Sequence, residues 1–313
     1  MSLSVAIQMD PMDSIDINGD STFVLALEAQ KRGYSLYHYL PSHLTLNDGR
    51  VTARAYPLTV QRKMGRHFDL GPMEALNLHE MDAVLMRQDP PFNMAYITAT
   101  HILEHIHPET LVVNDPFHVR NAPEKLFVTH FENVMPPTLI SADIDEVRAF
   151  RQEHKDIIVK PVYGNGGAGV FHLPPGDENL GALIELFTTT WCEPIMVQRY
   201  IPEVRKGDKR VILIEGRPVG AINRVPAVGE ARSNMHVGGR PEKATLTGRE
   251  LEICEVIGPT LAKNGIIFAG IDVIGGYLTE INVTSPTGLQ EVNRFDGVAL
   301  ESQIWDAIEA RLP

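Results

Sequence analysis

The alternation of short apolar runs with helical segments is the feature that most limits the fold of this chain. In the first 122 residues, strands are expected at residues 4–9, 34–40, 83–86 and 111–113, and helices at residues 20–32 and 93–107. Strands separated by helices favour a parallel sheet, because a parallel crossover needs a long connection. An α/β domain is therefore expected to end near residue 122.

The pattern changes after Lys125, where hairpins replace the alternation of strand and helix. Turns are expected at Glu215-Gly216 and Gly275-Gly276, as well as earlier at Asn47-Asp48-Gly49. The remaining expected elements are strands at residues 157–161, 170–173, 195–200, 210–215, 217–224 and 268–283, helices at 248–263 and 298–311, and a long loop at 225–241. The second half is thus of α+β type.

The bulk composition excludes several classes of protein. The chain has 313 residues and a formal net charge of −12, which disfavours a nucleic-acid surface because phosphate binding needs a basic face. No signal peptide or membrane-spanning run is expected, so no membrane partner is expected either. Only Cys192 and Cys254 are present, which excludes a disulfide framework and fits a reducing cytoplasm.

A glycine cluster between two β-prone runs is a candidate phosphate-binding loop. Its glycines, Gly164, Gly166 and Gly167 among them, let backbone N–H groups approach phosphate oxygens. A strand follows the cluster, whereas a helix follows the Rossmann fingerprint, and no Walker A lysine is present. Lys160 precedes the cluster and Lys125 lies upstream, where both suit a triphosphate. An ordinary glycine-rich hairpin turn is the alternative.

The end of the next strand is a candidate site for a nucleotide base. Gln198, Tyr200 and Ile201 lie where backbone groups can face an adenine edge. An apolar strand that simply ends in a loop explains the same pattern equally well.

Three oxygen-bearing side chains near the C-terminus form a candidate metal site. Glu280 and Asn282 are two residues apart on an expected strand and share a face, and Asp272 lies on the preceding strand. Oxygen ligands without Cys or His favour Mg²⁺ bound together with phosphates. A half-exposed strand with polar groups in water is the alternative. All three side chains can meet one ion only if the turn holds an odd number of residues or the hairpin carries a bulge.

Basic and hydroxyl groups in the same third of the chain are candidates for binding anionic substrates. Guanidinium groups suit carboxylate and phosphate, and a hydroxyl-bearing turn directly follows the metal strand. The candidates are Arg210, Arg224, Arg232 and Arg240, with Asn234 and the turn residues Ser285 and Thr287. Residues 225–240 are interpreted as a mobile cover over a reactive intermediate, a variable surface loop being the alternative.

Taken in order, these residues resemble the ATP-grasp superfamily and, within it, the bacterial glutathione synthetases. The superfamily likeness rests on Lys125, Lys160-Pro161, the glycine loop, Gln198-Arg199-Tyr200, Asp208-Lys209-Arg210, Asp272 and Glu280-Ile281-Asn282. The closer likeness rests on four strings, at residues 9–11 (MDP), 86–92 (MRQDPPF), 121–126 (NAPEKL) and 279–287 (TEINVTSPT). Gln88 departs from the lysine that the family often has there, and Tyr163 and Asn165 depart from aspartate and methionine.

The resemblance implies an ATP-grasp fold with a Rossmann-like pre-ATP-grasp domain over residues 1–122, a central lid over 123–200 and a C-terminal subdomain over 201–313. It implies ligation of γ-glutamylcysteine and glycine to glutathione through an acyl phosphate, with ATP as co-substrate, Mg²⁺ (or Mn²⁺ as a substitute) and a homo-oligomer, dimer or tetramer.

The roles that the resemblance implies fall into four groups: ATP binding by Lys125, Lys160, Gly164, Gly166, Gly167, Gln198, Tyr200, Ile201 and Asp208; metal binding by Asp272, Glu280 and Asn282; catalysis by Arg210, Arg224 and Arg232; substrate binding by Arg87, Asn234, Arg240, Asn282, Ser285 and Thr287. Two other functions stay open at this point. One is an ATP-grasp ligase that adds an amino acid to a different peptide or protein, and the other is a nucleotide-binding regulatory protein without ligase activity.

Overall fold

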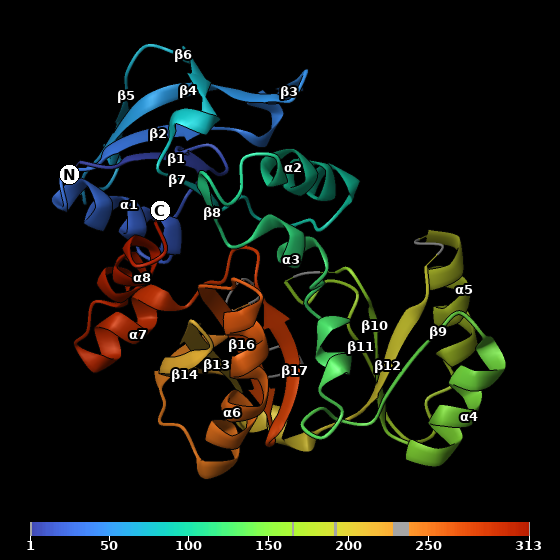
Figure 1. The fold of residues 1–313 in the computed structure, drawn as a ribbon. Coiled ribbons are helices and arrows are strands. Elements are labelled where there is room, and N and C mark those ends of the chain that lie inside the picture. The colour runs from blue at the N-terminus through green and yellow to red at the C-terminus, as the bar shows by residue number, and fades with distance from the viewer. Residues whose placement is uncertain (1, 165, 191–192, 228–237, 313) are drawn as a thin grey trace.

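The computed structural model describes residues 2–164, 166–190, 193–227 and 238–312, in which three β-sheets each carry packed helices (Figure 1). None of the described helices is long and apolar enough to cross a bilayer.

The N-terminal sheet combines a parallel core with an antiparallel extension. Its core strands are β1 (Ser4–Gln8), β2 (Ser35–Tyr39), β7 (Ala83–Met86) and β8 (Leu111–Val113), which pair in the order β2-β1-β7-β8. The extension adds β3 (Leu44–Asn47), β4 (Arg50–Val60), β5 (Phe68–Leu70) and β6 (Glu74–Asn77) beyond β2. Helices α1 (Ser21–Lys31), α2 (Met94–Glu104) and α3 (Pro116–Arg120) belong to the same part of the chain.

The central sheet is antiparallel and covered on one face. Its order is β11-β10-β12-β9, formed by β11 (Phe171–Leu173), β10 (Ile157–Pro161), β12 (Ile195–Arg199) and β9 (Thr138–Ser141). Helices α4 (Ile144–His154) and α5 (Leu180–Thr190) bury Val147, Leu183 and Phe187 against it. The opposite face of this sheet is turned toward the C-terminal sheet (Figure 1).

The C-terminal sheet has the order β15-β14-β13-β16-β17. Its strands are β13 (Asp208–Ile214), β14 (Arg217–Val225), β15 (Arg240–Lys243), β16 (Phe268–Ile274) and β17 (Tyr277–Asn282), all antiparallel to their neighbours. Helix α6 (Gly248–Lys263) packs on one face, while α7 (Leu289–Asp296) and α8 (Leu300–Glu309) lie between this sheet and the N-terminal domain (Figure 1).

Local sequence signals account for many of these boundaries. The Asp20 carboxylate caps α1 by accepting the Phe23 N–H at 2.6 Å, and Gly33 follows the helix with a φ of +81°. The turn at Asp48-Gly49 has φ values of +49° and +80°, as a two-residue hairpin turn requires. The helix expected at 248–263 is confirmed at those residues.

Several elements were not predicted from the sequence. Helices α4, α5 and α7 and strand β9 lie in segments for which no element was expected. The loop expected at 225–241 is shorter than that, because Val225 still belongs to β14 and pairs with Arg240 of β15. Residues 228–237 of that loop lie outside the described residues.

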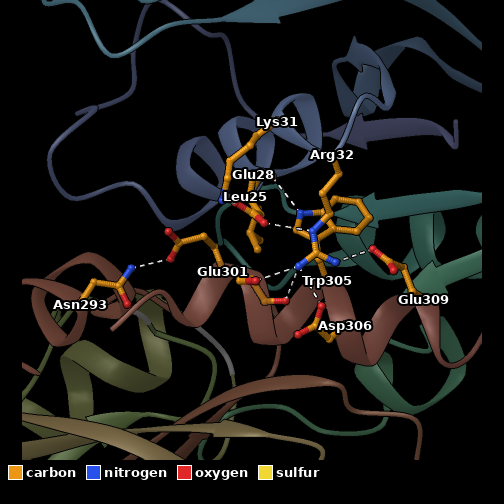
Figure 2. A network of polar contacts seen from close by, with 10 residues as sticks. Leu25, Glu28, Lys31, Arg32, Asn293, Glu301, Trp305, Asp306 and Glu309 are labelled. Atoms are coloured by element: carbon orange, nitrogen blue, oxygen red, sulfur yellow. Dashed lines mark hydrogen bonds and ion pairs between the residues drawn. The ribbon is translucent and has the colours of Figure 1, made fainter. Parts of the chain in front are cut away.

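A partly exposed polar network joins the N-terminal domain to the last helix. Figure 2 shows the Arg32 guanidinium reaching from the end of α1 to α8, where it contacts Asp306 at 2.8 Å and Glu309 at 2.5 Å while also holding Glu28 at 3.0 Å. The Trp305 indole N–H donates to the Leu25 carbonyl at 2.9 Å. Because one guanidinium satisfies acceptors on both helices, the network fixes how the two domains meet.

Replacing Arg32 by alanine is therefore expected to lower the free energy of unfolding by about 1 to 2 kcal/mol, since the nearly buried Glu28 and the more exposed acceptors on α8 lose their donor. Urea unfolding of Arg32→Ala measures the effect. The control is Arg148→Ala, whose ion pair with Asp145 is exposed and is expected to contribute at most about 0.5 kcal/mol. Equal unfolding midpoints for the two variants would contradict the role of the network.

Candidate active site

One face of the C-terminal sheet carries most of the expected catalytic and metal-binding residues. Side chains two apart on a strand share a face, as do directly paired residues on neighbouring strands. Arg224 pairs with Asp208, Arg210 with Asp272, and Gly270 with Asn282. The shared face therefore bears Asp208, Arg210, Arg224, Asp272, Glu280 and Asn282. The opposite face is apolar and packs on α6.

A β-bulge places the three candidate metal ligands on that face. The two-residue turn Gly275-Gly276 pairs Ile274 with Tyr277 and Val273 with Leu278. The register then shifts, so that Asp272 pairs with Glu280 and Thr279 is the extra residue. The three side chains therefore share a face because the hairpin carries a bulge, one of the two conditions predicted from the sequence. A regular ladder would have paired Asp272 with Thr279.

Asp272 is the centre of a buried ion-pair network. Arg210 donates to both of its carboxylate oxygens, at 2.5 and 3.0 Å, and Arg224 approaches Asp272 at 3.0 Å and Asp208 at 2.5 Å. Burial opposes ionisation of Asp272, but the two guanidinium groups outweigh it and hold the pKa of this carboxyl well below its usual range. The network keeps two guanidinium groups charged and oriented at the sheet face.

Two lysines approach from the central sheet and its glycine loop. The Lys125 ammonium donates to the Gly164 carbonyl and lies 3.6 Å from the Glu280 carboxylate. Lys160 is 7% exposed, and burial lowers its pKa to about 8. Gly166 and Gly167 have φ values of +62° and +77°, which glycine adopts without strain. The loop and both lysines thus face the carboxylates.

The oxygen-bearing set fits a hard divalent cation. Glu280 is the most open member, with a side chain that is 25% exposed, whereas Asp272 uses about three of its roughly four lone-pair sites on arginine. Asn282 adds an amide within 3.5 Å of Asp272. No group of three or more His, Cys, Asp or Glu side chains suited to a metal occurs in the described part of the chain, so an ion here would depend on the amide as well as the carboxylates.

A cleft with a free volume of about 140 Å³ lies between the central sheet and the C-terminal sheet. Its lining combines charged side chains with apolar ones, among them Ile158, Val170, Val204 and Ile274. The expected residues that line it are Lys160, Gly167, Gln198, Tyr200, Ile201, Asp208, Arg224, Asp272 and Glu280.

A histidine that was not predicted from the sequence also lines the cleft. The His172 ring stacks on Tyr200 with centroids 4.0 Å apart, and its Nε2 lies 2.7 Å from an Asp156 carboxylate oxygen. Gln198, in contrast, donates its side-chain amide to Thr138 within the central sheet. A flat aromatic surface beside apolar side chains is suited to a nucleotide base. The sequence predicted only that His172 lies on a β-strand.

The substrate-side residues lie where the N-terminal domain meets the turn after β17. Arg87 donates to the carbonyls of Thr284 and Pro286, and Ser285 donates its hydroxyl to the Arg87 carbonyl at 3.3 Å. Arg210 donates to the Thr287 carbonyl at 3.0 Å. The turn therefore connects Arg87 with the ion-pair network.

Arg240 is an expected residue that the structure does not bring to this site. It pairs with Val225, which places it on the opposite face from Arg224, and its exposed side chain binds Glu242. Arg232 and Asn234 lie outside the described residues, as does most of the expected cover. The sequence also missed Glu124, whose pKa burial raises to about 7 with help from the negative charge of Glu280.

Comparison with family models matches both parts of the chain. The model for the prokaryotic glutathione synthetase N-terminal domain matches residues 3–120, and the model for the prokaryotic glutathione synthetase ATP-grasp domain matches residues 124–297. Glutathione synthetase of Brucella melitensis biotype 1 is 59% identical over 99% of this chain and 100% of the relative. That of Mesorhizobium japonicum is 60% identical over 99% of both.

Solved structures share the fold at much lower identity. D-cycloserine synthetase DcsG has a TM-score of 0.69 at 14% identity, covering 99% of this chain and 100% of its own. The ATP-grasp ligase PsnB complexed with minimal precursor has a TM-score of 0.65 at 17% identity, covering 99% of both chains. These two likenesses establish the ATP-grasp fold.

Glu280→Gln and Asp272→Asn are expected to separate metal binding from the stability of the ion-pair network. Both should lower turnover by about 100-fold or more, because each removes a charged oxygen ligand. Only Asp272→Asn should also lower the free energy of unfolding, by about 3 kcal/mol, since two buried guanidinium groups lose their counter-charge. Turnover against Mg²⁺ concentration, with urea unfolding, measures both effects. Equal stability of the two variants would contradict the central position of Asp272.

Proposed function

The chain belongs to the prokaryotic glutathione synthetase family, and we propose that it forms glutathione from γ-glutamylcysteine and glycine, converting ATP to ADP and phosphate. The observation that carries the proposal is the single charged sheet face, with Asp272, Glu280 and Asn282, which meets Lys125 and Lys160 at the cleft between the two sheets. An ATP-dependent carboxylate–amine ligase needs this combination of phosphate, metal and carboxylate binding.

The reaction needs activation because a free carboxylate has no usable leaving group. The cysteinyl carboxylate attacks the γ-phosphorus of ATP, the bond to ADP breaks, and an acyl phosphate forms. The glycine nitrogen then attacks the acyl carbon, and phosphate leaves as the amide forms. The glycine ammonium loses two of its three protons in this step and keeps the third as the amide N–H; one proton departs with the phosphate and the other passes to solvent.

Each charged group of the site has a task in these two steps. Lys125 and Lys160 neutralise phosphate oxygens from the glycine-loop side, and Mg²⁺ held by Asp272, Glu280 and Asn282 would supply further neutralising charge. Arg210 and Arg224 stabilise the acyl phosphate and the tetrahedral oxyanion, because Asp272 holds both guanidinium groups at the same face. Exclusion of water from the substrate-filled cleft limits hydrolysis of the acyl phosphate.

Several finer points remain proposals. A fold relative, PsnB, has been solved with Mg and ADP, which supports Mg²⁺ here, and Mn²⁺ is proposed as a substitute because it accepts the same oxygen ligands. A homo-oligomer, a cytoplasmic location, the subdomain limits at residues 122 and 200, and roles for Arg232 and Asn234 in the intermediate also stand as proposals.

An acid–amine matrix tests the reaction. With Mg-ATP, phosphate release is expected only when γ-glutamylcysteine and glycine are both present, and mass spectrometry should detect glutathione. Turnover of another acid–amine pair without glutathione formation would reassign the chain to a different ATP-grasp ligation. ATP binding without ADP formation for any pair would make it a regulatory nucleotide-binding protein.

The affinity for Mg-ATP is expected to fall as pH rises through about 8, because burial lowers the pKa of Lys160 to about 8 and the free protein then loses this charge. The affinity falls rather than rises because the ATP phosphates stabilise the protonated, charged form of Lys160. Titration calorimetry between pH 7.5 and 9.5 should show a loss approaching about tenfold per pH unit. Lys160→Arg, which stays charged, should flatten the profile. The same slope in both proteins would contradict the assignment.

A further inference from the structure

Three aromatic rings form a row from the core of the N-terminal domain to the glycine loop. Tyr96 of α2 is 1% exposed, and the Phe92 ring centroid lies 5.4 Å from that of Tyr96. Phe92 in turn stacks on Tyr163, with ring centroids 6.4 Å apart and ring planes inclined by 13°. Phe92 follows β7 of the N-terminal sheet, whereas Tyr163 follows β10 of the central sheet and directly precedes Gly164. The row therefore joins two parts of the chain that carry different sheets.

The end of the row in the N-terminal domain is firmly held. Tyr96 lies in the first turn of α2, and its backbone N–H donates to the side chain of the N-cap residue Asn93 at 3.1 Å. Its ring belongs to a buried hydrophobic cluster, against which Phe92 also packs. Pro90 and Pro91 precede Phe92 and restrict the backbone there. Phe92 is thus a fixed surface on which another ring can pack.

Tyr163 lies at the other end of the row and is 41% exposed. Among the described residues, Phe92 supplies the one aromatic ring on which it stacks. Offset rings at this separation attract each other beyond the effect of the apolar area that they bury. The stack therefore gives an otherwise exposed side chain a defined position against the N-terminal domain.

Gly164 connects Tyr163 with the charged groups of the candidate site. A Cβ atom at Gly164 would lie 2.5 Å from the Pro161 Cγ, so the backbone is closely packed at this point. The Gly164 carbonyl accepts a hydrogen bond from the Lys125 ammonium, which lies 3.6 Å from the Glu280 carboxylate. A displacement of Tyr163 would move Gly164 with it, and Lys125 would lose this acceptor.

The crevice beside the stack is almost filled. Its lining includes Phe92, Glu124, Tyr163 and Gly164, and its free volume is about 10 Å³. That volume is at the lower limit for a single water molecule. Because the two rings pack with so little room for solvent, the removal of either ring would leave a gap beside Gly164.

We propose that Tyr163 is a positioning residue for phosphoryl transfer: stacked on Phe92, it holds the start of the glycine loop, so that Gly164 keeps Lys125 in place for the ATP phosphates. The proposal rests on the proposed function. In this role Tyr163 acts through Gly164 and Lys125, without a contact to the reacting atoms. The aspartate that the family resemblance leads us to expect at this position has no ring to stack, and it would add a negative charge beside a phosphate-binding loop.

Binding of the non-hydrolysable ATP analogue AMPPNP with Mg²⁺, measured by calorimetry, tests the role of the ring. Tyr163→Ala is expected to weaken this binding about three- to tenfold, the loss expected for a well-placed aromatic pair. Tyr163→Phe keeps the ring and should bind the analogue as tightly as the unmodified protein. In turnover, KM for ATP should rise by a similar factor in Tyr163→Ala, while KM for γ-glutamylcysteine changes less than about twofold.

A double-mutant cycle tests whether Tyr163 acts through Phe92. Phe92→Leu keeps an apolar side chain on the core cluster but has no ring to stack, so it should weaken AMPPNP binding as much as Tyr163→Ala does. The variant with both changes should lose no more than either single variant, because each change removes the same contact. Phe117→Ala is the matched control, since this ring is 46% exposed and contacts Arg120 and His118 on α3. It should leave the affinity for AMPPNP unchanged.

An unchanged affinity for AMPPNP in Tyr163→Ala would overturn the proposal, as would an equal loss in Tyr163→Phe. Additive losses in the variant with both changes would also overturn it, because the two rings would then act independently. These results are distinguishable from a failure of the proposed function, since AMPPNP binding needs no turnover. Failure of the unmodified protein to make glutathione would instead refute the proposed function.

Discussion

The rest of the site depends on one extra residue in the last hairpin. Side chains on a strand alternate between faces, so without the bulge at Thr279 the strand β17 would turn Glu280 and Asn282 toward α6. Glu280 and Asn282 would then lie on the face that packs on α6, Ile281 would leave that face, and neither Glu280 nor Asn282 would lie beside Asp272. The bulge therefore determines both the hydrophobic core under the sheet and the charged face above it.

Charge at that face is balanced locally, although the chain as a whole carries a net charge of −12. Arg210 and Arg224 are both nearly buried, and Asp272 contacts each of them, so neither guanidinium is left without compensation. Lys160 differs, because no ion pair holds it within the described chain and burial lowers its pKa. Arg210 and Arg224 are thus already neutralised by the protein, whereas Lys160 gains most of its stabilisation from an incoming phosphate. That difference makes nucleotide binding favourable without a strongly basic surface.

The sequence predicted those features that depend on neighbouring residues. The cap at Asp20, the turn glycines and the alternation in β17 are local signals, and each is found in the structure. Helix α5 also has apolar residues at Leu180, Leu183, Ile184 and Phe187, a helical spacing that the sequence interpretation passed over. The sequence could not place Arg240 on the opposite face, because the face is fixed by the pairing of Arg240 with Val225. No local sequence signal sets the register between these two strands. His172 and Tyr163 became candidates only when tertiary contacts showed their neighbours.

The junction between domains links stability with the substrate side of the site. Arg32 satisfies acceptors on α1 and α8, and the N-terminal domain is thereby held against the sheet that carries the ion-pair network (Figure 2). Arg87, from the same domain, meets the turn after β17 through long carbonyl contacts and lacks an ionic partner in the described chain. The two arginines therefore differ at one interface: the first contacts carboxylates on both helices, whereas the second contacts a hydroxyl and backbone carbonyls. Because Arg87 lies at an interface that Arg32 and the apolar contacts of α1 with α8 help to fix, the stability of this junction and the geometry of the turn after β17 are linked.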